Sequence, residues 1–93
     1  MAKMAIAHQN ALLDLYKFSR PDGWCVTFSC LEPDPTRRPA VRRAVRALAR
    51  KGLAEFHKGL WTEDGYPAGA GYCITDAGVV LAEAILTKIA LAP

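Results

Sequence analysis

The sequence has few cysteines and no long apolar run. Its 93 residues include three cysteines, and no stretch reaches the roughly 18 consecutive apolar residues that span a bilayer. Because an odd number of cysteines argues against a disulfide framework, we expect Cys25, Cys30 and Cys73 to be reduced thiols. The N-terminal segment lacks the apolar core of a secretory signal. These absences predict a cytoplasmic protein that does not contact a membrane.

Motifs for catalysis or cofactor binding are also missing. There is no glycine-rich phosphate loop, no G-x-S-x-G turn and no H-E-x-x-H pair. Four residues separate Cys25 from Cys30 without a second ligand pair, and His8 and His57 lie in different segments, so no zinc-binding spacing is recognisable. We therefore expect no enzyme activity, no cofactor and no metal. The 52% hydrophobic and 23% charged residues predict one globular domain over residues 1–93.

Acidic residues are absent from one strongly basic segment. Seven of the twelve lysines and arginines fall between Arg37 and Lys51, whereas the rest of the chain holds all nine acidic residues and is net negative. At helical spacing the apolar residues form one arc, at Val41, Ala44, Val45 and Leu48. Arginines recur every four residues on another arc, at Arg38, Arg42, Arg46 and Arg50. Such a row is either a solvated helix face or an anion-binding face. Solvated faces usually mix charges of both signs, so the pattern favours anion binding.

Periodicity, caps and turn residues predict a mostly helical α+β fold. We expect helices over 5–18, 28–33, 37–51 and 76–91. Threonines are the expected N-caps of the last three helices, at Thr27, Thr36 and Thr75. Gly52 should end the basic helix. The strands 53–61 and 71–75 should form a β-hairpin around a loop rich in glycine, with Glu63 and Asp64 near its tip.

The last predicted helix is apolar around most of its circumference. One small core cannot cover such a helix, so we expect a homodimer in which this helix and the spare arc of the first helix meet a second copy. The predicted interface residues are Ile6, Leu13, Leu81, Ile85, Leu86 and Ile89.

The order of these elements resembles a winged helix-turn-helix domain. Two local motifs carry the resemblance, Leu48-Ala49-Arg50-Lys51-Gly52-Leu53 at the end of the basic helix and Tyr72-Cys73-Ile74-Thr75-Asp76-Ala77-Gly78 at the start of the last helix. They are similar to the "L-x-x-K-G-L" and "Y-x-[LI]-T-x-x-G" patterns of small bacterial and phage regulators of the MarR, PadR and ArsR type. The resemblance covers about residues 10 to 90.

The resemblance implies sequence-specific binding of double-stranded DNA by a dimeric transcriptional regulator. The helix 37–51 would enter the major groove. The implied DNA-binding residues are Thr36, Arg37, Arg38, Arg42, Arg43, Arg46 and Arg50. The loop departs from the family pattern, because it has no cation between Trp61 and Gly71. The alternative is a winged-helix module, such as a phage-type inhibitor, whose basic helix and apolar last helix bind a protein partner.

Overall fold

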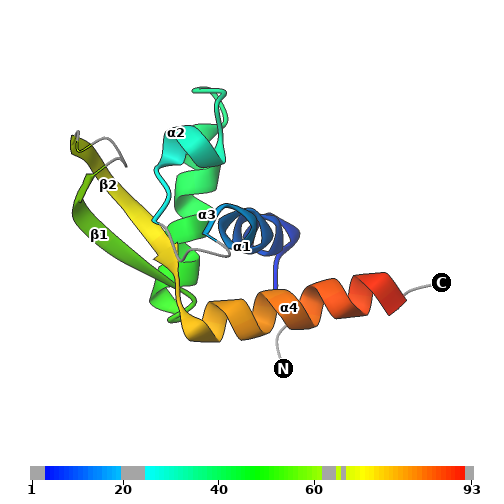
Figure 1. Cartoon of the computed structure of the whole chain (residues 1–93). Coiled ribbons are helices and arrows are strands. Elements are labelled where there is room, and N and C mark those ends of the chain that lie inside the picture. The colour runs from blue at the N-terminus through cyan, green and yellow to red at the C-terminus, as the bar shows by residue number, and fades with distance from the viewer. Residues whose placement is uncertain (1–3, 20–24, 62–64, 66, 92–93) are drawn as a thin grey trace.

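The chain folds into four helices and one two-stranded antiparallel sheet (Figure 1). A computed structural model describes residues 4–19, 25–61, 65 and 67–91. In chain order the elements are α1 (Ile6–Ser19), α2 (Phe28–Leu31), α3 (Arg38–Arg50), β1 (Ala54–Trp61), β2 (Pro67–Ile74) and α4 (Asp76–Leu91). The predicted α+β class and the order of the elements are confirmed. The predicted helix boundaries are correct to within two residues.

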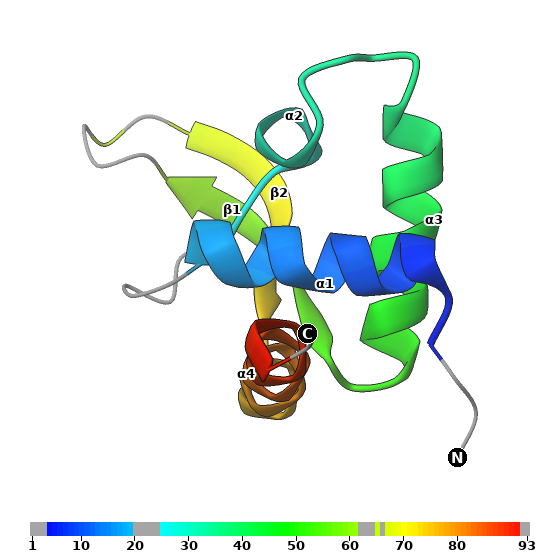
Figure 2. The same ribbon diagram turned by 90° about the vertical axis from the view of Figure 1, so that its right-hand side faces the viewer.

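Helix α1 lies at the centre of the fold. It contacts α2, α3, β2 and α4, and Figure 2 shows it crossing in front of the hairpin and α3. Leu12 and Leu15, three residues apart on one face, are fully buried, as are Val45 and Leu48 of α3. Burying a side chain of this size stabilises the fold by about 1.5–3 kcal/mol. These four residues are therefore the main anchors between α1 and α3.

Helix α2 is shorter than the predicted 28–33. Its last residue is Leu31, and Glu32 is already extended, with φ −143° and ψ 102°. The cause is Pro33, because the residue before a proline is sterically pushed out of helical geometry. The predicted N-cap position of Thr27 is confirmed, although its hydroxyl pairs with that of Ser29 at 3.0 Å and makes no cap hydrogen bond.

Strand β2 begins earlier than the sequence indicates. Residues 67–70 were expected in the loop, but β2 starts at Pro67 and pairs with β1 along its length. The pairing register of the two strands shifts between His57 and Trp61. The glycines at this irregularity, Gly59 and Gly69, take positive φ angles of 66° and 85°. Glycine is favoured where a bulge bends a strand. The glycine content therefore marks an irregular strand, and the loop prediction was wrong for these residues.

Cys25 and Cys73 form a disulfide, so the prediction of reduced thiols was wrong for this pair. Val26 and Tyr72 exchange both backbone hydrogen bonds, at 2.8 and 2.9 Å. The adjacent residues then face each other as a non-hydrogen-bonded antiparallel pair, the arrangement in which Cα atoms approach most closely. The Cα atoms of Cys25 and Cys73 are 4.1 Å apart. Cys30 is free and exposed.

The turn after α3 and the start of α4 are joined by hydrogen bonds. Gly52 has φ 76°, its N–H donates to Ala49 O at 3.0 Å, and the Leu53 N–H donates to Leu48 O at 2.9 Å. This is the Schellman arrangement expected when glycine ends a helix. The Thr75 hydroxyl donates to Gly52 O at 2.6 Å and accepts from the N–H of Gly78 at 3.1 Å. The predicted roles of Gly52 and Thr75 are confirmed.

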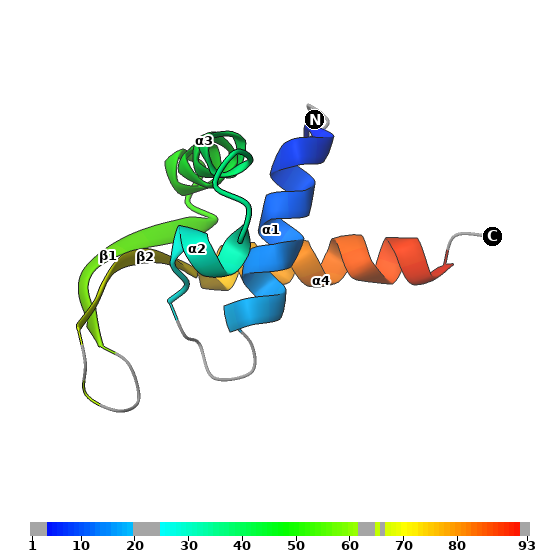
Figure 3. The ribbon, with the colours of Figure 1, turned by 90° about the horizontal axis from the view of Figure 1, so that it is seen from above.

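Helix α4 extends beyond the rest of the fold. Figures 1 and 3 show it running from the base of the hairpin past α1. Its buried residues, Gly78 and Ala82, both lie in its first half. The hydroxyl of Tyr16 in α1 donates to Glu83 Oε2 at 3.1 Å and links the two helices there. The part of α4 that follows Ile85 therefore extends past the core.

Candidate nucleic-acid interface

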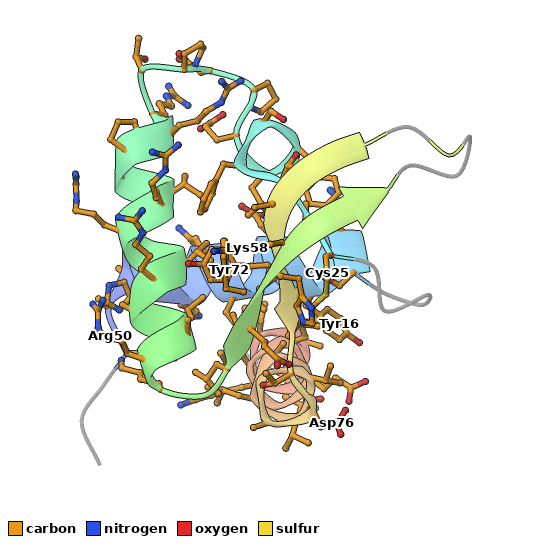
Figure 4. All side chains as sticks on the ribbon, turned by 90° about the vertical axis from the view of Figure 1, so that its left-hand side faces the viewer. Tyr16, Cys25, Arg50, Lys58, Tyr72 and Asp76 are labelled. Carbon is orange, nitrogen blue, oxygen red and sulfur yellow. A yellow bond between two sulfur atoms is a disulfide. The ribbon has the colours of Figure 1, made fainter. Side chains whose placement is uncertain are left out.

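Helix α3 separates an apolar face from a cationic one. Its buried residues are Ala44, Val45, Ala47 and Leu48. The arginine face, by which we mean Arg42, Arg43, Arg46 and Arg50, is exposed, and Figure 4 shows Arg50 near the C-terminal end of α3. Since α3 contains no acidic residue, the charges on this face are not offset within the helix.

The side chain of Arg38 forms hydrogen bonds with the segment that connects α2 and α3. Its Nε donates to Glu32 O at 2.7 Å and its Nη2 donates to Pro33 O at 2.9 Å. Those carbonyls follow the end of α2, where the chain no longer supplies helical partners. Arg38 is partly buried. Its contact with DNA stays a prediction, and the structure places two of its donors on the protein backbone.

An ionised carboxylate lies at the start of α3. Thr36 does not cap α3, because its hydroxyl donates to Asp34 Oδ1 at 2.7 Å and its N–H donates to the same oxygen at 3.0 Å. The predicted N-cap was wrong, and Arg37 occupies that position. Hydrogen bonds from Thr36 lower the pKa of Asp34. Arg37 Nε lies 3.8 Å from Asp34 Oδ2. Thr36 and Arg37 therefore sit beside a negative charge that weakens their attraction for an anion.

Three aromatic rings pack in sequence behind one residue of the arginine face. The guanidinium carbon of Arg42 lies 5.0 Å from the centroid of the Phe28 ring, a cation–π distance. The Phe28 ring is 5.6 Å from that of Tyr72, which is 5.2 Å from that of Phe56. Arg42 thus lies over Phe28 of α2, whose ring is packed in turn against β2. No local pattern indicates this cluster of tilted rings, because its members are distant along the chain.

The hairpin adds a cation that the sequence reasoning missed. Lys58 is exposed and is two residues from Phe56, and strand alternation places both on one face of β1. Figure 4 shows Lys58 and Tyr72 on the side of the hairpin toward α3. The signal was available in the sequence as the alternation of Phe56 and Lys58. The acidic residues Glu63 and Asp64, expected near the loop tip, lie outside the described residues.

The predicted dimer residues fall into two groups. Leu13, Leu81 and Ile85 are partly buried and pack against the core. Ile6, Leu86 and Ile89 are exposed, with 77%, 40% and 55% of their surfaces accessible. Two further apolar residues of α4, Val80 and Leu91, are 69% and 78% exposed. Leu86 and Ile89, three residues apart, share one side of α4, whereas Val80 and Leu91 lie on the opposite side.

A small pocket lies where α1, α2 and α3 meet. It has a volume of about 200 Å³, and its lining includes Asp14, Leu31, Val41 and Ala44. Burial among these side chains raises the pKa of Asp14. The pocket offers one carboxyl group and otherwise mostly small apolar side chains, which gives it little chemistry for binding a polar ligand.

No helix in the described ranges combines the length and the apolar character needed to cross a membrane. Comparisons of the chain with protein-family models, with curated proteins and with solved structures find no match.

Proposed function

We propose that this protein is a winged helix-turn-helix DNA-binding protein that inserts α3 into the major groove of double-stranded DNA. The observation that carries the proposal is the arginine face of α3, which is exposed, free of acidic residues and backed by a buried apolar face. A helix fits the width of the major groove, and arginine binds both phosphate oxygens and the acceptors of guanine.

The arginines do not have equal roles in this proposal. Arg43, Arg46 and Arg50 form no ion pair with any residue in the described ranges, so their donors remain available to DNA. Arg42 reaches the groove from its position over Phe28. Lys58 contacts the backbone from the hairpin. Arg38 holds the entry to α3 through Glu32 O and Pro33 O and affects binding indirectly.

The proposed regulator is a homodimer. Leu86 and Ile89, three residues apart on one side of α4, are exposed apolar residues that a second copy can cover. A two-fold axis would present two α3 helices to successive major grooves, about 34 Å apart, and would favour a palindromic site. A dimeric protein that binds such a site is suited to transcriptional regulation.

Salt-dependent DNA binding tests the proposal. Arg43→Ala with Arg46→Ala removes two cations whose side chains pack against little else. If each contacts a phosphate, the slope of log affinity against log salt should fall by about 1.8, or 0.9 per contact. The matched control, Lys17→Ala with Lys88→Ala, removes the same charge from exposed positions on α1 and α4 and should change the slope little.

Two outcomes would contradict the assignment. An arginine double variant that stays folded and binds duplex DNA as tightly as the wild type would exclude α3 from the groove. Equal losses in the two double variants would show that net charge alone drives binding. Either result would favour the alternative, in which the basic helix and α4 bind a protein.

A further inference from the structure

A cluster of metal-ligating side chains lies on the sheet face opposite α3. The sulfur atoms of Cys25 and Cys73 and a ring nitrogen of His57 all lie within 4.8 Å of one another. Figure 4 shows Cys25 on the far side of the hairpin from Lys58 and Tyr72. The three residues come from the segment before α2, from β1 and from β2, so only the folded chain brings them together.

The strand register explains why they meet. Cys73 pairs with Glu55 and Gly71 pairs with His57, so Glu55, His57 and Cys73 share one face of the hairpin. The bridge between Val26 and Tyr72 places Cys25 opposite Cys73.

We propose that Cys25, Cys73 and His57 form a zinc-binding site when the disulfide is reduced. Two thiolates and one imidazole are ligands that zinc prefers, and a tetrahedral ion with bonds of about 2.0–2.3 Å separates its ligand atoms by about 3.5–3.8 Å. The present separations, within 4.8 Å, require only side-chain rotation to reach that geometry. In a reducing compartment the two cysteines are thiols, and zinc then replaces the disulfide as the link between them.

Glu55 places a carboxylate near His57. Its Oε2 lies 3.7 Å from His57 Nε2. Metal-binding histidines commonly donate their second ring N–H to a carboxylate, which fixes the ring and makes the other nitrogen a better ligand. The His57 side chain is 44% exposed, so an ion can enter from solvent and water can complete the fourth position.

The disulfide and the metal exclude each other. A dithiol reductant transfers two electrons and two protons to the Cys25–Cys73 bond, which yields two thiols and the oxidised reductant. Zinc then displaces the two thiol protons and binds the thiolates together with neutral His57. Either state attaches the segment before α2 to β2, but the zinc-bound state also includes β1.

Cobalt titration of the reduced protein tests the site. Cobalt(II) added without oxygen should bind at one equivalent, with thiolate-to-cobalt charge-transfer and tetrahedral absorption bands, and equimolar zinc should remove them. His57→Ala should weaken binding at least about tenfold, since partial loss of ligand support already costs 10–100-fold. Cys30→Ser is the matched control, because Cys30 is free and exposed, and it should bind as the wild type does.

Two results would overturn the proposal. One is reduced wild-type protein that binds cobalt no more tightly than a Cys25→Ser, Cys73→Ser variant. The other is unchanged affinity and unchanged absorption in His57→Ala, which would leave a dithiol without a histidine ligand. Because His57 lies on the exposed face of β1, this variant should keep its fold, and circular dichroism checks that it does. None of these measurements involves DNA.

Discussion

Gly78→Ala should destabilise the protein even though alanine is the better helix former. Gly78 is buried in the first turn of α4. A Cβ atom there would clash with the carbonyl oxygen of Leu53 and lie 2.7 Å from Ile74 Cγ1. The Leu53 oxygen also accepts a hydrogen bond from Thr75 N at 3.2 Å. The added methyl group therefore pushes the start of α4 away from the turn that follows α3.

The expected net loss is about 2 kcal/mol. Overpacking costs about 1–3 kcal/mol, and weakening the hydrogen bonds that Thr75 makes to Leu53 O and Gly52 O costs about 1 kcal/mol more. Replacing glycine by alanine inside a helix returns about 1 kcal/mol. For a domain of this size, 2 kcal/mol corresponds to a melting temperature lower by roughly 10 °C.

Thermal unfolding followed by circular dichroism measures this loss. The matched control is Ala84→Gly at an exposed position of the same helix, where only helix propensity acts and about 1 kcal/mol should be lost. A Gly78→Ala variant that melts at or above the wild-type temperature would refute the steric argument. It would mean that α4 can shift without cost at its junction with the turn.

Three further predictions concern α3, the pocket and α4. Arg38→Ala should lower stability in urea by about 1–2 kcal/mol through loss of its two carbonyl contacts, and a loss of DNA affinity at unchanged stability would instead make Arg38 a DNA contact. The raised pKa of Asp14 means that the folded state binds its proton more tightly, so stability should fall as pH rises above the ordinary value of 3.8. Asp14→Asn should therefore be more stable than wild type at pH 7 and lose this advantage below about pH 3.8, and a less stable variant at pH 7 would contradict the assignment. Leu86→Asp with Ile89→Asp should convert a wild-type dimer to monomers in sedimentation at micromolar concentration, and a monomeric wild type would rule out the α4 interface.

Local signals were sufficient to predict the helices and their ends. The arginine row and the apolar arc of α3 have a helical period, and Gly52 and Thr75 act through hydrogen bonds to residues near them in sequence or at the adjoining turn. These features depend on few long-range contacts, so residue type and spacing specify them.

Features that depend on tertiary pairing were missed. The disulfide follows from the bridge between Val26 and Tyr72, and no local pattern specifies a pairing between residues 46 positions apart. In the sequence, Arg38 is indistinguishable from the other arginines of the row. Its side chain donates hydrogen bonds to two backbone carbonyls, and these carbonyls are free to accept them only because α2 ends before Pro33. The cluster of Cys25, His57 and Cys73 depends on the same bridge and on the hairpin register.

The Cys25–Cys73 disulfide divides the chain topologically. Its two cysteines are 48 residues apart, and the closed loop contains α2, α3, β1 and most of β2, while α1 and α4 lie outside it. Closing a loop of this length lowers the entropy of the unfolded chain enough to contribute about 4 kcal/mol. Two oxidised copies can exchange their α4 helices while both disulfides stay intact. Exchanging α3 would require the disulfide-closed loop of one copy to pass through that of the other. Domain swapping of the oxidised protein is therefore restricted to the helices outside the loop, and α3 stays with the chain that carries it.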